Sequence, residues 1–477
     1  MPRKRILILS LTAAVLLALA VTALLVTRVD LAELTQRLEV RLSTTFGLEV
    51  KTRGETRLHL WPRPRAVFTD VVVRDGETEV LRVPRATAAI AWLPLLRGQV
   101  QVSNLTLTEP ALTVRRGPNG SFTPHLKRKR PELEPGQGPA PPRLPVSKIT
   151  VEGGKARFTD KITDSVAELD HIALVMGDLH RGADGRLAFT GDLSAERLRV
   201  NRIEMQQLRG TFSTEKGVYR AAPMRGSLCG SNATFSLETD LSGAHPAWRL
   251  ELAADGLSLA ELFRSLAGRV LYEGKVDLRM RLSATGPGRL VHHLDGTVDV
   301  AGKQVVQHGF DLDGFVSSLR KSHQVNPVDV GAYLVVGPVG TLLSRSFDLA
   351  NLYRQLQEEK SQAIDQLSFD WEIENGMARA KDVALRTREN RVAVQGAIDL
   401  PRLHYDGIIL AVLDNQGCAE LTEKISGALV KPSIQPFSIL NTLAGPLAWL
   451  LNKFQEIVDP GECRPFYEGS VAHPRSP

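Results

Sequence analysis

Residues that could do chemistry are few and scattered along this 477-residue chain. The histidines are dispersed, and the adjacent His292 and His293 would point to opposite faces of a strand, which makes a poor shared metal site. Asp311 and Asp313 would face one way on a strand and could bind a cation, but the glycines that flank them favour a hairpin turn or a helix start. We therefore expect no metal site.

The sequence also lacks the motifs of common catalytic sites. It contains no Gly-x-Ser-x-Gly elbow, no Walker-type phosphate loop, no His-Glu-x-x-His and no Cys-x-x-Cys. We expect no catalytic residue and no cofactor, so the protein is predicted not to be an enzyme. An exported hydrolase is the weakest of the alternatives.

Three cysteines exclude a disulfide-dense scaffold and a four-cysteine zinc site. Cys418 and Cys463 frame the C-terminal segment, and we predict a disulfide between them if the chain lies in an oxidising compartment. In the chain-entropy model, closing a loop of this length stabilises the fold by about 4 kcal/mol. Cys229 is predicted to be a buried free thiol.

Composition excludes several classes of protein. Hydrophobic residues make up 43% of the chain and charged residues 23%, which fits neither a disordered polymer nor a multispanning membrane protein. Aromatic residues are only 5%, so a surface for stacking nucleic-acid bases has little material, and the net charge of +6 is modest. We expect no nucleic-acid partner.

The N-terminus predicts a membrane anchor. Three basic residues precede an uncharged run from Ile6 through Leu16 to Val26, and Arg28 closes the run. As a helix this run is about 32 Å long, enough to cross the hydrocarbon core of a bilayer. The basic residues hold the N-terminus in the cytoplasm, so the rest of the chain is exported. A cleaved signal peptide is the alternative, although its apolar region is normally shorter.

Beyond Leu48 the apolar residues recur with a period of two, which predicts strands. Pairs such as Asn375-Gly376 predict hairpin turns between them. In the clearest strands apolar residues alternate with charged ones. These apolar residues are Leu250, Leu252, Val276, Leu278, Met280 and Leu282.

The predicted fold is mostly β, with about twenty strands of five or six residues each. After an entry helix that begins at Asp30 and ends before Gly47, only short helices are expected, around Ser258–Ala267, Leu312–Leu319 and Leu349–Leu367. So few helices cannot cover the apolar face of the sheet, which must curl on itself or face a second sheet. We expect a transmembrane helix followed by an elongated, curled antiparallel sheet. Its apolar groove would be lined by the six residues above, unless they fill a closed sandwich core.

Composition shifts divide the chain into five parts. A cytoplasmic tip and anchor (1–28) precede an N-terminal β region (29–123), and a linker rich in proline and basic residues (124–145) leads to the main β region (146–432). The last part (433–477) is predicted to be helical.

The C-terminal part carries apolar residues at helical steps, among them Phe437, Leu440, Leu447, Leu451 and Phe454. One interpretation is an amphipathic helix that touches lipid or a partner protein. The other is a helical cap that covers the end of the sheet, where unpaired backbone would otherwise recruit other chains.

Short motifs along much of the chain carry a family resemblance. In the N-terminal half they are Leu58-His-Leu-Trp-Pro-Arg-Pro64, Trp92-Leu-Pro-Leu-Leu-Arg-Gly98, Val102-Ser-Asn-Leu-Thr-Leu-Thr-Glu-Pro110 and Arg116-Gly-Pro-Asn-Gly-Ser-Phe122. In the C-terminal half they are Gly376-Met-Ala-Arg-Ala-Lys-Asp-Val383, Asn390-Arg-Val-Ala-Val-Gln-Gly396, Ile398-Asp-Leu400 and Gly427-Ala-Leu-Val-Lys-Pro432. With these motifs the chain resembles the AsmA family of Gram-negative bacteria.

The resemblance implies a single-pass inner-membrane protein whose bulk lies in the periplasm. That family is similar to bridge-like lipid transfer proteins, which hold lipid in a repeating apolar β-groove. The implied partners are membrane phospholipids and envelope proteins, and the implied role is outer-membrane biogenesis and lipid homeostasis. The alternative is a non-catalytic envelope scaffold or assembly factor that binds a partner protein through a closed β body.

Overall fold

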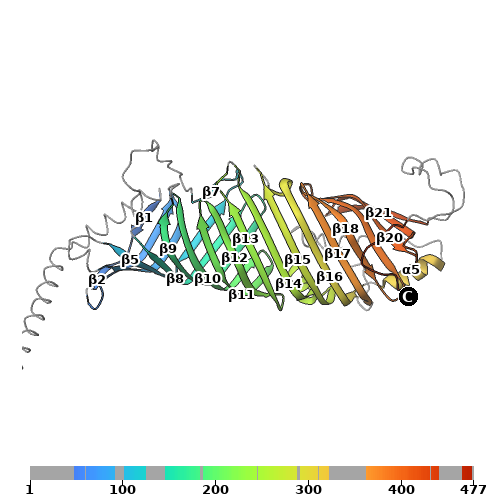
Figure 1. The fold of residues 1–477 in the computed structure, drawn as a ribbon, viewed down its shortest axis with the longest axis horizontal. Helices are drawn as coiled ribbons and strands as arrows, with labels where there is room; N and C mark the ends of the chain where they lie inside the picture. The colour runs from blue at the N-terminus through green and yellow to red at the C-terminus, as the bar shows by residue number, and fades with distance from the viewer. Residues whose placement is uncertain are drawn as a thin grey trace, which may run out of the picture. The chain divides into compact units, whose positions relative to one another are not determined.

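The computed structural model describes residues 48–59, 61–91, 101–124, 146–182, 186–243, 245–286, 290–309, 311–321, 361–429, 431–439 and 465–474. In these ranges the chain forms 22 strands, two α-helices and one 3₁₀ turn (Figure 1). The prediction of a mostly β protein with few helices is therefore confirmed.

The chain divides into two compact units. The N-terminal unit comprises Met1–Asn201 and Gln206–Gly217, and the C-terminal unit comprises Arg202–Met205 and Val218–Pro477. Strand β11 (Ile203–Glu215) contributes residues to both units.

The N-terminal unit is built from ten further strands. They are β1 (Glu49–Thr52), β2 (Thr56–His59), β3 (Arg65–Asp75), β4 (Thr78–Ile90), β5 (Val102–Thr108), β6 (Ala111–Arg116), β7 (Phe122–Thr123), β8 (Lys148–Asp160), β9 (Ser165–Arg181) and β10 (Leu187–Val200). Most pair antiparallel, but β8 runs parallel to β5 and to β6. Parallel neighbours need a long connection, and the predicted linker 124–145 falls between β7 and β8.

Alternating residues of β3 and β4 form the core of this unit. Ala66, Phe68, Val83, Ala86, Ala88 and Ile90 are buried, and partly buried apolar residues of β2 and β5 pack against them. One face of the strands thus buries its side chains, as the period of two predicts.

The C-terminal unit is a meander of long strands. They are β12 (Val218–Leu228), β13 (Ser231–Asp240), β14 (Ala247–Ser258), β15 (Tyr272–Thr285), β16 (Leu294–His308), β17 (Ser361–Glu374), β18 (Met377–Arg386), β19 (Arg391–Asp399), β20 (His404–Leu413), β21 (Ala419–Ala428) and β22 (Lys431–Ile439). Each pairs antiparallel with the next along the chain. The turn from β17 to β18 is the predicted Asn375-Gly376 pair, and both residues have the positive φ that a type I′ turn requires.

Two helices lie at one edge of this meander, here called the lower edge because it is the bottom edge in Figure 1. Helix α4 (Leu259–Ala267) follows β14 directly, and the Ser258 side chain caps it by accepting from the Glu261 N–H. Helix α5 (Leu312–Lys321) follows β16, and Asp311 accepts from the Gly314 N–H at 2.8 Å. Both helices were predicted from the sequence, and the capping role of Asp311 explains the paired aspartates as a helix start.

Three expectations were wrong. The helix predicted over Leu349–Leu367 is absent from 361 onward, where β17 alternates Leu367, Phe369, Trp371 and Ile373 instead. The segment predicted to be helical from 433 still belongs to the sheet up to Ile439, so Phe437 lies in β22. The strands of the meander have 9 to 15 residues rather than five or six.

A polar cluster fixes α5 to the lower edge. Asp313 accepts hydrogen bonds from the Thr387 hydroxyl and the Asn390 amide, both at 2.6 Å, and from the Gln362 amide at 3.0 Å. These three partners are buried, and so are Leu312 and Val316 on the helix itself. The carboxylate therefore satisfies donors that have no access to water.

We predict that Asp313→Ala lowers the free energy of unfolding by about 2–4 kcal/mol, because it leaves three buried donors without their acceptor. Chemical denaturation of the purified protein measures this change. The control is Asp406→Ala, an exposed aspartate on β20, whose effect should stay within about 0.5 kcal/mol. Equal effects of the two substitutions would contradict the role of the cluster.

Candidate functional site: the apolar face of the C-terminal unit

Register brings the six predicted groove residues onto one face of two adjacent strands. Leu250 lies opposite Leu282 and Leu252 opposite Met280, while Leu278 faces Ala254 and Val276 faces Leu257. Directly opposed residues in an antiparallel pair share a face and lie about 5 Å apart at Cβ. The structure thus brings together all six residues that the alternation singled out.

The apolar face continues onto the neighbouring strands. On one side Phe235 and Leu237 of β13 lie opposite Leu252 and Leu250. On the other side Val298 and Val300 of β16 lie opposite Met280 and Leu278. Beyond these, Trp371 and Phe369 of β17 lie opposite Val298 and Val300. The sequence alone did not identify these residues, because strand pairing cannot be read from alternation within one strand.

Burial varies along this face. From β13 to β16 most of its large side chains are only half-buried, and Leu237 is 39% exposed, whereas Val276 at 3% is fully buried. From β18 to β20 the corresponding side chains are buried. They are Val383, Val392, Val394, Ile398, Leu410 and Val412. The part of the face from β13 to β16 therefore keeps apolar surface that the protein's own atoms cover incompletely.

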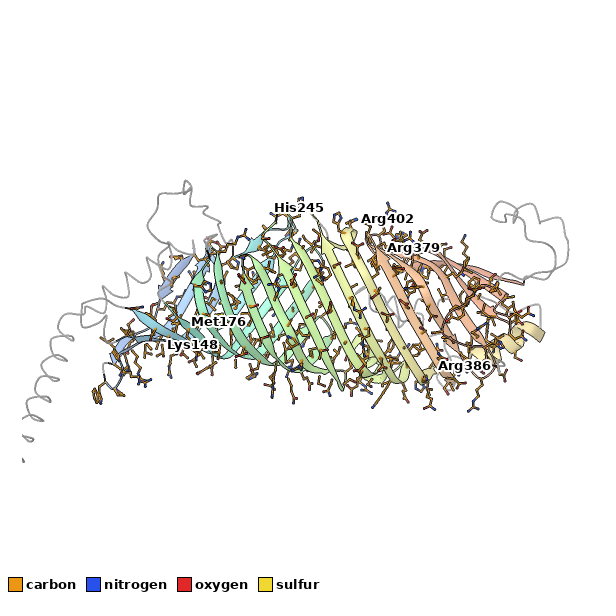
Figure 2. All side chains as sticks on the ribbon, in the orientation of Figure 1. Lys148, Met176, His245, Arg379, Arg386 and Arg402 are labelled. Atoms are coloured by element: carbon orange, nitrogen blue, oxygen red, sulfur yellow. The ribbon has the colours of Figure 1, made fainter. Side chains whose placement is uncertain are left out.

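The opposite face of the same strands is polar. Arg249, Glu251, Arg279 and Arg281 alternate with the apolar residues and are exposed. Polar side chains also lie at the ends of the strands: His245 and Arg402 lie along one edge of this unit and Arg386 along the other (Figure 2). The sheet is therefore amphipathic, with an apolar face between two polar edges.

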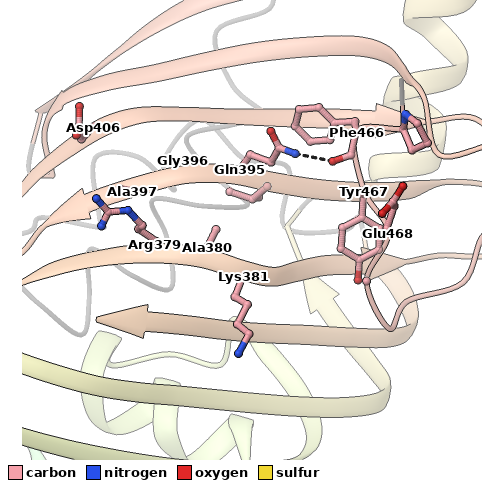
Figure 3. Close-up of a pocket in the computed structure, with 13 residues that line it drawn as sticks. Arg379, Ala380, Lys381, Gln395, Gly396, Ala397, Asp406, Phe466, Tyr467 and Glu468 are labelled. Carbon is pink, nitrogen blue, oxygen red and sulfur yellow. Dashed lines mark hydrogen bonds between the residues drawn. The ribbon is translucent and has the colours of Figure 1, made fainter. Parts of the chain in front are cut away.

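A C-terminal strap, Pro465–Pro474, lies on the polar face of β18–β20. Tyr467 and Val471 pack with Ala384, Ala393 and Ala411 in a small buried cluster. The strap's backbone is held at both ends. Gln395 donates to the Phe466 carbonyl at 2.6 Å (Figure 3). Arg391 donates to the Val471 carbonyl at 3.2 Å.

Asp382 anchors the middle of the strap. It accepts from the Tyr467 hydroxyl and, at 3.1 Å, from the Ser470 N–H. Burial raises the pKa of Asp382, but the hydrogen bonds from Ser470, Tyr467 and Ser368 outweigh it and leave the pKa below its ordinary value. Burial and the bond to Asp382 raise the pKa of Tyr467 to about 12, so the phenol remains a donor at neutral pH.

A cleft of about 840 Å³ opens between the strap and the sheet (Figure 3). Its polar lining carries both charge signs, from Arg379 and Lys381 on β18, Asp406 on β20 and Glu468 on the strap. Sequence analysis missed this cleft because its two walls lie far apart along the chain. The cleft therefore offers charged contacts of both signs.

A row of three aspartates crosses the polar face beside the strap. Asp370 of β17 lies directly opposite Asp299 of β16 and Asp382 of β18. Burial raises the pKa of Asp370, and the carboxylates of Asp299 and Asp382 raise it further. Within the described ranges, no three His, Cys, Asp or Glu side chains are arranged to hold a metal ion.

The cysteines fall into two classes. Cys418, immediately before β21, is disulfide-bonded. Its predicted partner Cys463 lies outside the described residues, so the pairing stays a prediction. Cys229 is a free thiol, but half-buried rather than buried. Burial and the nearby Glu261 raise the pKa of this thiol, which keeps it protonated.

The remaining predicted residues lie outside the described part of the chain. These are Ile6, Leu16 and Val26 of the anchor and Leu440, Leu447, Leu451 and Phe454 of the C-terminal segment. Among the residues that the structure does describe, no helix has the length and apolar character to cross a membrane.

The sequence of this chain matches a protein-family model over most of its length. The model of the AsmA family matches residues 1–192 and again 178–383, which together span most of the chain. The chain belongs to the AsmA family. The second match in this AsmA protein includes β13–β16, which carry the half-buried apolar face, and ends before the strap. No curated protein and no solved structure matches the chain.

We predict that substitutions of two neighbouring aspartates in this row change the stability of the protein in opposite directions. Asp370→Asn should stabilise the protein at neutral pH by about 0.5 kcal/mol, because it removes like-charge repulsion across the strands. Asp382→Asn should destabilise it, because the strap donors lose an ionised acceptor.

The difference in stability between each variant and the wild type should become smaller at low pH. The raised pKa of Asp370 means that its repulsion is absent once it is protonated, and the lowered pKa of Asp382 means that its contribution is lost as pH falls through that pKa. Melting temperatures of the three proteins, measured from pH 7 down to about pH 3, below the ordinary carboxyl pKa, test this. Shifts of the same sign in both variants would contradict it.

Proposed function

We propose that this AsmA protein is a non-catalytic carrier that holds phospholipid acyl chains on the apolar face of its C-terminal unit. The observation that carries the proposal is the contiguous row of half-buried apolar side chains across β13–β16. A closed core would bury these side chains fully, as the same face does across β18–β20.

The chemistry of the face suits an acyl chain. Each methylene transferred from water to an apolar surface contributes roughly 0.8 kcal/mol, and no precise polar contact is needed. A headgroup would stay in water at the polar edges of the sheet, where His245 and Arg402 lie on one side and Arg386 on the other. Such binding requires neither a metal nor a cofactor.

Family membership supports an envelope role. We propose that Ile6–Val26 anchors the chain in the inner membrane, with the N-terminus in the cytoplasm and the bulk in the periplasm. From that position the protein would contribute to outer-membrane biogenesis and lipid homeostasis by moving phospholipid. The segment beyond Ile439 would touch lipid, cap the sheet or bind an envelope partner.

We predict that the double variant Leu252→Gln/Met280→Gln loses most of the phospholipid that copurifies with the full chain. These two residues lie opposite each other, so the substitutions place two amides in the middle of the apolar face. Each amide lacks a hydrogen-bond partner once an acyl chain covers it, which weakens lipid binding. Phosphate analysis of extracted lipid and native mass spectrometry measure the bound amount.

The matched control is Glu251→Gln/Arg281→Gln. This pair lies directly opposite in the same two strands, one residue along, on the polar face. It leaves the net charge unchanged and should leave the bound lipid unchanged. Lipid-free wild-type protein would reject the carrier, and a test variant that mainly loses about 2–4 kcal/mol of stability would indicate a closed core instead. The protein would then be an envelope scaffold.

A further inference from the structure

The hairpin formed by β2 and β3 ends in an exposed tryptophan. Trp61 is 83% exposed, the highest value among the large hydrophobic side chains that the structure describes. Pro62 and Arg63 beside it are exposed as well, whereas Pro64 is buried. Single exposed apolar residues are common, but a tryptophan this exposed leaves its whole indole in contact with water.

The base of this hairpin is well fixed. Thr56–His59 pairs residue by residue with Arg65–Phe68, and the Ile90 N–H donates to the Pro64 carbonyl at 2.9 Å. Leu58, three residues before Trp61, packs against the buried cluster of β3 and β4. The hairpin thus packs its partly buried leucine against the core and leaves its tryptophan exposed, so the tip projects from a support that is fixed by hydrogen bonds.

Charge around the tip has one dominant sign. Arg57, Arg63 and Arg65 of the hairpin are all exposed. The acidic residue just before β2, Glu55, is paired with Arg57 at 2.6 Å. The hairpin therefore presents the amphipathic indole of Trp61 together with the guanidinium groups of neighbouring arginines.

We propose that the tip of the β2–β3 hairpin is a membrane-contact site that inserts Trp61 into the interfacial layer of a bilayer containing anionic phospholipid. Tryptophan prefers this layer because its ring is apolar and its N–H is polar. Arginines beside it are attracted to negatively charged headgroups within a Debye length of the surface. A protein partner would require a ring of packed contacts around the tryptophan, and a narrow tip offers little such area.

The site does not depend on the proposed carrier function. It concerns the N-terminal unit alone and would orient that unit on a membrane whether or not lipid occupies the apolar face.

The test uses the full chain in vesicles of phosphatidylethanolamine and phosphatidylglycerol whose acyl chains carry bromine, which quenches nearby indoles. The chain has five tryptophans, so the contribution of Trp61 is the emission of the wild type minus that of Trp61→Phe. We expect this contribution to shift to shorter wavelength and to lose most of its intensity. A contribution that keeps the wavelength of water-exposed indole and is not quenched would overturn the proposal.

Charge is tested by Arg57→Gln/Arg63→Gln/Arg65→Gln. This variant should restore much of the Trp61 emission, as should high salt or vesicles of phosphatidylcholine alone. The control replaces three exposed arginines of the same unit outside the hairpin, Arg85, Arg115 and Arg209, and should leave quenching unchanged. Equal effects of the two triple variants would reject recognition of anionic lipid at the tip.

A second reporter keeps this test separate from the carrier proposal. Trp248 lies on the apolar face of β14, in phase with Leu250 and Leu252, and its contribution is isolated with Trp248→Phe. Quenching of Trp61 without quenching of Trp248 supports the membrane contact and counts against lipid on the apolar face. The reverse result supports the carrier and overturns the membrane contact.

Discussion

The arrangement of the C-terminal unit depends on one geometric constraint: side chains alternate between the two faces of a strand, and antiparallel pairing aligns equal faces. Because Leu252 lies opposite Met280, and Met280 opposite Val298, alternation in separate strands adds up to a continuous apolar surface. The same rule places Glu251, Arg281 and Thr297 in a row on the other face. A shift of one residue in the register of any strand pair would place apolar side chains on the polar face. The continuous apolar surface therefore requires the observed register, and burial of that surface favours this register.

The two faces are covered in different ways. On the polar face, a strap with no regular secondary structure is held over alanines, where small side chains let its backbone approach β18–β20. Asp382 anchors the strap there, but it lies opposite Asp370, and the two carboxylates repel each other. At the lower edge, α4 and α5 are fixed by capping side chains and by Asp313. Local polar contacts at the borders of this unit thus add to the apolar burial across β18–β20.

Much of this fold could be predicted from the sequence, since alternation, capping residues and Asn-Gly turns act over a few residues. That is why α4, α5 and the Asn375-Gly376 turn were predicted, and why the six apolar residues share a face. Strand lengths were underestimated because positive-φ residues such as Gln304 shift the phase of a strand without ending it. Leucines before Leu367 fitted a helical spacing equally well, so part of β17 was mistaken for a helix. The strap and its cleft could not be predicted, because Arg391 and Val471 meet across 80 residues of sequence.

Strands β12 to β22 pair in strict succession, each hydrogen-bonded to the next. Apart from the strap and α5, which contact several strands, the interfaces between strands join nearest neighbours, as in a modular array in which energy terms are summed along one dimension. Insertion or deletion of a whole hairpin would leave the remaining ladders and the alternation of faces intact. Genes that encode this kind of meander can therefore change in length by two strands at a time.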